Sequence, residues 1–231
     1  RQKVGEAAKN KVLKNYKTEH IAQDQLRAIC KLNMPNTAAK LRLLTVNIFF
    51  APNSFGGATI VAEALNKNFK KNNDLELAVF TTSYQNEIPA HELVRTTWEG
   101  MPVFRAAISM NEILSPKYGN DRVEQQFKET LLAYRPHIVH FHSIQGLGAG
   151  IANVCRDLKI PYIITLHDAW WLCENQFLIT PDGKYCGQKN IRFSICATCV
   201  KDKAFTKKRT TELRKVLDGA AMLITPSEYW R

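Results

Sequence analysis

The alternation of short apolar runs with helical periodicities constrains the fold of this chain more than any other feature. Residues 43–50 read LLTVNIFF, a nearly continuous apolar run that suits a strand buried on both faces of a parallel sheet. Further strands are predicted at 75–82, 138–141, 162–166 and 221–225, with two short strands around a Glu-Gly turn within 96–104. Strands that alternate with helices predict an α/β fold with a doubly wound, all-parallel, Rossmann-like sheet and right-handed crossovers.

The predicted helices between these strands are recognised by apolar residues at helical spacing. Two of the stripes are Val61, Ala64, Leu65 and Phe69, and Val123, Phe127, Leu131 and Leu132. Two further helices are expected over 147–158 and 203–217. Each stripe marks the helix face that we expect to pack on the sheet.

The residues before the first strand have a different character. Residues 1–36 are predicted to form a helical segment and a linker, with an apolar stripe at Ala22, Leu26, Ile29 and Cys30. This segment has no strand of its own, so we expect it to pack on another structure. Residues 37–231 are predicted to form the Rossmann-like domain, with an aperiodic loop over 170–200, and a loop of this length is usually functional. The chain begins with Arg1 rather than Met, and we expect it to be part of a longer protein.

The formal net charge of +11 is compatible with nucleic acid, anionic lipid or phosphorylated partners. The densest basic cluster consists of Lys201, Lys203, Lys207, Lys208 and Arg209. A solvated helix face explains this cluster, and so does a basic face directed at a membrane or a lipid-linked phosphate. No apolar run approaches the roughly 20 residues of a membrane span, and no apolar signal segment opens the chain. We therefore expect a cytoplasmic protein, with peripheral membrane contact as the alternative to a purely soluble one.

The six cysteines fall into two groups. Cys30 and Cys155 lie in helical patterns and are predicted to be buried small hydrophobes. The other four, Cys173, Cys186, Cys196 and Cys199, crowd into the aperiodic loop, and the last two form a CxxC pair. Four thiolates around one tetrahedral zinc ion would make a closed, structural site. Two disulfides and free thiols are the open alternatives.

Polar and glycine residues follow the ends of the predicted strands, where ligands bind in an open parallel sheet. Gly56 and Gly57 come after the first strand and open a helix. Glycines let the backbone approach a ligand closely, and the N–H groups of the helix N-terminus attract an anion. An ordinary turn is the alternative, but the position after the first strand favours a phosphate-binding turn.

Two later strands end in histidines. His140 and His142 share one face of a strand by alternation, and His142 stands at its end. His167 ends the next strand and is followed by Asp168. An imidazole can donate to a sugar hydroxyl or a phosphate and changes charge near neutral pH. His142, His167 and Asp168 are therefore candidate site residues, although adjacent strand residues point to opposite faces and Asp168 need not contact His167.

Two other candidates have equally plausible structural roles. Trp170 and Trp171 suit a carbohydrate site because aromatic rings pack on the apolar faces of sugars, and two core tryptophans are the alternative. Ser227 follows the last strand and is a candidate ligand contact, although capping of the next helix is the more frequent role of such a hydroxyl.

Four of these segments together resemble the N-terminal domain of retaining glycosyltransferase family 4 over about residues 41–231. They are the strand leading into FGGA at 55–58, RPHIVHFH at 135–142, ITLHDAWWLC at 164–173 and AAMLITPS at 220–227. The resemblance implies a GT-B architecture of two Rossmann-like domains, in which this half holds the acceptor and a C-terminal half binds the nucleotide sugar. The segment around Asn15–Ala22 resembles the helical tail that closes such enzymes, so it is a candidate for the end of an upstream transferase.

The resemblance also implies roles for individual residues. Gly56 and Gly57 would approach the donor phosphates and the acceptor, and His167 would be the catalytic contact to the transferring sugar or its departing phosphate. His142, Asp168, Trp170 and Ser227 would complete the binding site. The co-substrate would be a nucleotide sugar, the acceptor a glycan or a lipid-linked molecule, and the chemistry would require no cofactor. This half alone is expected to be inactive.

Other functions remain open at this point. A nucleotide-sugar epimerase or phosphorylase could share the architecture, and a degenerate acceptor-binding domain would have no activity. A zinc-stapled, basic nucleic-acid-binding module would explain the net charge and the CxxC pair. That module would not explain His167 and Trp170 at a strand end, and the aromatic residues do not interleave with the basic cluster. We therefore expect no nucleic acid partner.

Overall fold

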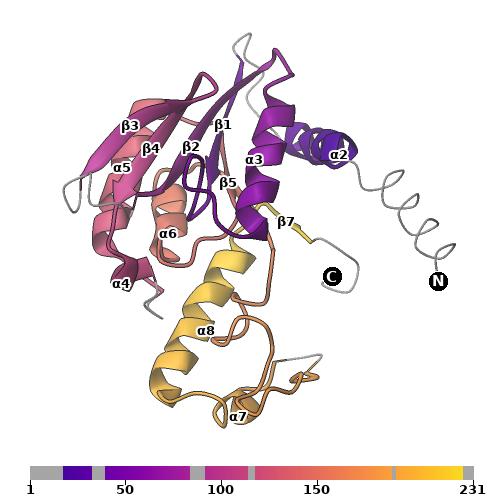
Figure 1. The fold of residues 1–231 in the computed structure, drawn as a ribbon, viewed down its shortest axis with the longest axis vertical. Helices are drawn as coiled ribbons and strands as arrows, with labels where there is room; N and C mark the ends of the chain where they lie inside the picture. Colours follow the sequence, from indigo (N-terminus) through magenta and orange to yellow (C-terminus); the bar gives the residue numbers. More distant parts are fainter. Residues whose placement is uncertain (1–17, 33–39, 84–91, 114–117, 189–190, 226–231) are drawn as a thin grey trace, which may run out of the picture.

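The structure is a computed structural model that describes residues 18–32, 40–83, 92–113, 118–188 and 191–225 (Figure 1). Ser227 lies outside the described residues, as do residues 1–17. A seven-stranded sheet forms the centre, with the strand order β3-β4-β2-β1-β5-β6-β7. Its strands are β1 Leu41–Val46, β2 Leu75–Ser83, β3 Leu93–Trp98, β4 Met101–Ala107, β5 Ile138–Phe141, β6 Tyr162–Thr165 and β7 Met222–Ile224. The predicted α/β, doubly wound fold is confirmed.

The prediction that every strand is parallel is wrong for one strand. β3 pairs with β4 in antiparallel orientation, whereas the other strand pairs are parallel. The physical reason is the predicted Glu-Gly turn, because Glu99 and Gly100 have φ values of 47° and 81°. Two residues with positive φ make the tight turn of a hairpin, which reverses the chain direction. β3 lies at the sheet edge, so the parallel centre that carries the candidate site is unaffected.

Helices cover both faces of this sheet (Figure 1). Their bounds are α2 Thr18–Lys31, α3 Gly57–Phe69, α4 Met110–Ile113, α5 Asp121–Tyr134, α6 Gly150–Asp157, α7 Phe193–Cys196 and α8 Lys203–Asp218. Alternate strand residues point to the two faces. Leu44 belongs to the core with α5, α6 and α8, whereas its neighbour Leu43 belongs to the core with α2 and α3.

α2 supplies part of the second face. Its residues Ala22 and Ile29 are buried in the same cluster as Leu43 of β1, Ile138 of β5 and Ile163 of β6. α2 therefore packs on this sheet, as its apolar stripe predicts. The expected burial of Cys30 is wrong, because Cys30 is exposed on α2 beside the fully buried Ile29. Cys155 on α6 is buried, as predicted.

The predicted helix stripes are confirmed at Val123, Phe127 and Leu131 of α5 and at Leu65 and Phe69 of α3, but each stripe also includes a residue that is exposed. On α3 the buried face contains Thr59, Ala62 and Leu65, whereas Val61 is 40% exposed. On α5 Leu132 is 54% exposed. Thr59 is buried although it is polar, because its hydroxyl is hydrogen-bonded to Asn47 and Phe55. A pattern of apolar residues alone therefore omits Thr59 from the buried face of α3. Of the helices that the structure describes, none has both the length and the apolarity needed to cross a membrane.

Candidate functional site

The strand-end histidines meet at one rim of the sheet. Nδ1 of His142, after β5, lies 2.9 Å from Nε2 of His167, after β6. The rings of His140 and His142 are stacked at a tilt, with centroids 4.2 Å apart, and Nε2 of His140 lies 2.7 Å from the hydroxyl of Thr165. Neighbouring parallel strands place their carboxyl ends at the same edge, and the predicted convergence of these two segments is confirmed.

A buried amide connects the diglycine turn to the same rim. Asn47, which follows β1 and is 0% exposed, donates from Nδ2 to the carbonyl of Phe49 and to the hydroxyl of Thr59, at 2.7 and 2.9 Å. Its Oδ1 accepts from the backbone N–H of Ser143 after β5, at 2.9 Å. One side chain therefore joins the ends of β1 and β5 to the first turn of α3. Sequence analysis missed Asn47, although a polar residue inside the apolar run 43–50 was the available signal.

The diglycine turn leaves the N-terminus of α3 uncovered. Gly56 is the N-cap residue, with φ 82° and ψ 162°, and no side chain caps the helix. This backbone conformation is accessible almost only to glycine. A Cβ atom built on Gly56 or on Gly57 would meet no atom within 4 Å. The open N–H groups and the helix dipole make this end of α3 suitable for binding an anion.

The three histidines are poised to be neutral near pH 7. Burial, with the neighbouring His167 as a second cause, lowers the pKa of His140 to about 3. Burial also lowers the pKa of His142 well below its ordinary value. The pKa of His167 is lowered by burial, although the nearby carboxylate of Asp168 opposes this shift. Neutral imidazoles each offer one N–H donor and one bare nitrogen acceptor.

Asp168 organises the loops around the rim. Its Oδ1 accepts from the backbone N–H of Trp170 at 2.9 Å. Its Oδ2 accepts from the amide of Gln176 at 2.6 Å and from that of Gln145 at 3.4 Å. Gln145 follows β5 and Gln176 lies in the cysteine-rich loop, so one carboxylate joins two loops to the end of β6. The structure thus gives Asp168 a positioning role among protein groups, and both glutamines were missed by sequence analysis.

The sequence of this rim matches a known family. The model of Glycosyltransferase Family 4 matches residues 55–231. The chain belongs to glycosyltransferase family 4. This assignment agrees with the resemblance carried by the strand-end motifs. A comparison with curated protein sequences finds no significant match.

Solved structures similar to this family 4 chain include three synthases. Sucrose-phosphate synthase from Thermosynechococcus elongatus is 11% identical, with a match over 80% of this chain and 42% of that one, at a TM-score of 0.48. α,α-Trehalose 6-phosphate synthase from Burkholderia multivorans is 11% identical, with a match over 80% of this chain and 39% of that one, at a TM-score of 0.43. The catalytic domain of starch synthase IV from Arabidopsis thaliana, bound to ADP and acarbose, is 19% identical. The match covers 71% of this chain and 38% of that one, at a TM-score of 0.37. The chain spans less than half the length of each of these proteins.

Within the family 4 chain, the two tryptophans after Asp168 are core residues. Trp170 is 9% exposed and Trp171 is 4% exposed, and their rings meet edge to face at a centroid distance of 5.2 Å. The guanidinium of Arg209 on α8 lies 4.8 Å from the centroid of Trp170. Of the two roles left open by the sequence, the structure therefore places Trp170 in the core, where its ring is covered.

Arg209 also changes the interpretation of the basic cluster. Lys201, Lys203, Lys207 and Lys208 are exposed, as a solvated helix face requires. Arg209, in contrast, is 1% exposed and donates to the carbonyl of Trp170 at 2.5 Å. It points inward because residues one or two positions apart on a helix face different directions. The cluster on the surface is thus smaller than the sequence predicts.

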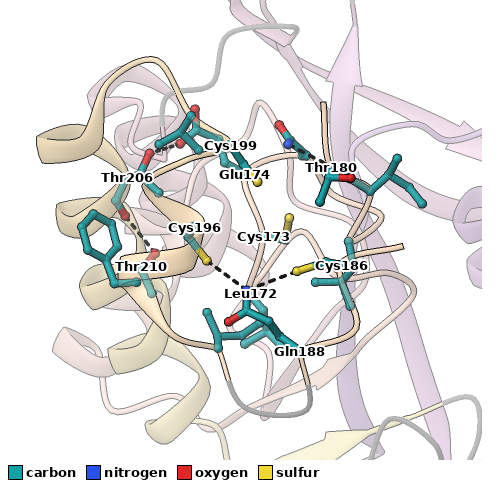
Figure 2. A pocket seen from close by; sticks show the side chains of 16 residues that line it. Leu172, Cys173, Glu174, Thr180, Cys186, Gln188, Cys196, Cys199, Thr206 and Thr210 are labelled. Carbon is teal, nitrogen blue, oxygen red and sulfur yellow. Dashed lines mark hydrogen bonds between the residues drawn. The ribbon is translucent and has the colours of Figure 1, made fainter. Parts of the chain in front are cut away.

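The four loop cysteines line one apolar pocket of about 80 Å³ between the loop and α8 (Figure 2). The amide of Gln188 donates to the sulfurs of Cys186 and Cys196, at 3.1 and 3.7 Å. Burial raises the pKa of the Cys173 thiol. Cys173, Cys186, Cys196 and Cys199 are free thiols in the structure.

The zinc interpretation of these cysteines requires more than their proximity. Within the part of the chain that the structure describes, no three His, Cys, Asp or Glu side chains are placed to hold a metal ion. The amide of Gln188 lies between two of the sulfurs (Figure 2), so a tetrahedral four-thiolate site would require this side chain to move. Structural zinc in this loop stays a prediction from the sequence.

Proposed function

We propose that this family 4 chain is the acceptor-side domain of an enzyme that transfers a hexose-type sugar from a nucleotide-sugar donor, with retention at the anomeric carbon. The donor would be bound by a second, C-terminal Rossmann-like domain facing this rim. The acceptor would be a glycan or a lipid-linked molecule. In the same proposal, residues 18–32 pack on the sheet as the end of an upstream unit, and the transfer chemistry needs no cofactor.

One observation carries the proposal: the open N-terminus of α3 and the His142–His167 pair are tied to the same rim through Asn47. Transfer from a nucleotide sugar releases a diphosphate, so the transition state accumulates negative charge on the leaving group. Fixed N–H donors and a helix dipole stabilise such charge without reorganising when the reaction occurs. The rim therefore combines the groups that a departing diphosphate needs.

His167 is suited to a role as a neutral hydrogen-bond donor. Its lowered pKa keeps the imidazole uncharged near pH 7, so it binds an oxygen without a strong charge of its own. It is half-buried, whereas His142 is buried, which makes His167 the histidine of the pair that a substrate can reach. We therefore assign to His167 the contact with the transferring sugar or its departing phosphate.

The nucleic-acid alternative loses part of its support. Phosphate-backbone binding depends on accessible cations, and Arg209 of the basic cluster is 1% exposed and engaged with Trp170. No feature of the rim favours an epimerase or a phosphorylase over a transferase. Compared with nucleic-acid binding, glycosyl transfer is the function that uses both the N-terminus of α3 and His167.

The test is a transfer assay on a longer protein that joins this chain to its donor-binding domain, with a labelled nucleotide sugar. We expect His167→Ala to lower kcat by about 100-fold or more, as loss of one transition-state donor does. His20→Ala is the control, because His20 is exposed on α2 and its loss should leave transfer unchanged. Unchanged transfer by His167→Ala would remove His167 from the mechanism, and inversion in the product would refute retention.

A further inference from the structure

The two buried histidines of the rim share an unusual pattern of hydrogen bonding. In His140, Nε2 meets the hydroxyl of Thr165, whereas no described residue bonds to Nδ1. In His142, Nδ1 meets His167, whereas no described residue bonds to Nε2. Each ring therefore has one nitrogen with a partner and one without, and both rings are almost completely excluded from solvent.

This pattern restricts where the protons lie. A neutral imidazole has one N–H and one bare nitrogen. A buried N–H without an acceptor is rarer in proteins than an under-used acceptor, and the tautomer of a histidine follows the hydrogen bond that its ring makes. The protons of His140 and His142 are therefore expected on the nitrogens that have partners, which are Nε2 and Nδ1 respectively.

The tautomer of His142 determines the tautomer of His167. If Nδ1–H of His142 donates, then Nε2 of His167 must accept, because the two atoms face each other at 2.9 Å. A neutral His167 whose Nε2 accepts must carry its proton on Nδ1. Since Nε2 is turned toward the buried His142, Nδ1 is the nitrogen left for a ligand.

We propose that His142 is a positioning residue that holds His167 in the Nδ1–H tautomer, so that His167 presents a hydrogen-bond donor to the rim. The role of that donor in transfer rests on the proposed function, whereas the tautomer itself does not. The reverse arrangement would leave a buried N–H on Nε2 of His142 with no acceptor among the described residues. An oxygen of a departing phosphate, or a sugar hydroxyl, is the type of group that this donor would bind.

The test is nuclear magnetic resonance of the 231-residue chain labelled with 15N in its histidines, at pH 7. Long-range proton–nitrogen correlations distinguish a protonated ring nitrogen from a bare one. The chain has six histidines, so single substitutions to Gln can assign each ring. We expect His167 to show a protonated Nδ1 and a bare Nε2. A protonated Nε2 on His167, or a doubly protonated ring, would overturn the proposal.

Two variants separate positioning from folding. His142→Asn places an amide N–H close to the former Nδ1–H and should keep the tautomer of His167. His142→Leu removes the donor, so the Nδ1–H population of His167 should fall. An unchanged tautomer of His167 in His142→Leu would show that His142 does not set it. If His142→Leu fails to fold, the wild-type spectrum and that of His142→Asn still test whether His167 carries its proton on Nδ1. A correct tautomer combined with unchanged transfer by His167→Ala would remove His167 from the mechanism and leave this inference standing. A correct tautomer combined with no transfer by the longer wild-type protein would sink the proposed function and also leave this inference standing.

Discussion

The guanidinium of Arg209 lies over the ring of Trp170, 4.8 Å from its centroid, and donates to the carbonyl of the same residue. This contact joins the middle of α8 to the loop that follows β6, the strand before the candidate site residue His167. Burial lowers the pKa of Arg209, and the nearby Glu174 and Cys173 oppose the shift. Arg209 has no ion pair among the residues that the structure describes, and this buried cation is held by stacking and hydrogen bonding. Its planar shape is therefore as important as its charge.

Arg209→Lys is therefore expected to destabilise the chain, although it keeps the charge. A lysine cannot both stack on Trp170 and donate to its carbonyl, so we expect a loss of about 1–3 kcal/mol in the free energy of unfolding. Urea unfolding monitored by tryptophan fluorescence measures it. Arg214→Lys on the exposed side of α8 is the matched control, where the change should stay within about 0.5 kcal/mol. Equal effects of the two substitutions would contradict a special role for the Arg209 contact.

The two neighbouring glycines of the rim should respond in opposite ways to alanine. Gly56→Ala forces a side chain into a conformation suited almost only to glycine and should cost about 1–3 kcal/mol of stability. Gly57→Ala lies in the first turn of α3 with open space around it, so stability should be kept or raised by about 0.5–1 kcal/mol. Thermal or urea unfolding of the two variants distinguishes these outcomes.

Gly57→Ala also separates binding from folding. If an anion approaches the open N-terminus of α3, the added methyl group stands in its way. Titration of the chain with inorganic pyrophosphate should shift the amide signals of Gly56 and Gly57 in the wild type, and the apparent affinity should fall several-fold in Gly57→Ala. A wild-type chain whose amides do not respond to pyrophosphate would remove the anion-binding role of this turn.

The parallel centre of the fold was predictable because its strands are marked by their apolar content. β5 was predicted over its observed range, Ile138–Phe141, and β6 differs by one residue. β1 ends at Val46, four residues before the apolar run ends. Residues 47–50 lie beyond the strand, where the side-chain amide of Asn47 bonds to Thr59 and Ser143. An apolar run predicts which residues are buried, and here buried residues continue beyond the end of β1 into the following loop.

The candidate site was predictable in its location but less so in the division of roles. The rule for strand ends brought His142 and His167 together, and these two residues share a hydrogen bond. The sequence could not distinguish a ligand contact from a positioning residue, because that depends on burial and on partners far along the chain. Asp168 is an example, since its partners Gln145 and Gln176 lie 23 and 8 residues away.

The stability of the chain should fall as the solution becomes acidic. His140 has a folded-state pKa of about 3, below the roughly 6.5 of an unfolded histidine, so only the unfolded state takes up a proton between these values. The stability contributed by a neutral His140 is therefore complete above pH 6.5 and is lost as the pH falls toward 3. His142 and His167, whose pKa values are also lowered, act in the same direction.

Urea unfolding at pH 7 and pH 5 measures this loss. Each such histidine contributes up to about 1.4 kcal/mol per pH unit below 6.5, or about 2 kcal/mol at pH 5. His140→Gln keeps a polar side chain that does not titrate, so the difference between the two pH values should shrink by about that amount. If the difference stays the same in His140→Gln, protonation of this ring is not linked to unfolding.

The adjacent residues Ile29 and Cys30 on α2 test whether this helix is an integral layer of the domain. Ile29 is 0% exposed and packs in the cluster with Leu43 and Ile138, whereas Cys30 is exposed. Ile29→Ala leaves a cavity against the sheet and should cost about 2–4 kcal/mol in the free energy of unfolding. Cys30→Ala, one position along the same helix, should change it by less than about 0.5 kcal/mol. If both substitutions were neutral, α2 would not be docked in solution, and the face formed by β1 and β5 would need another cover.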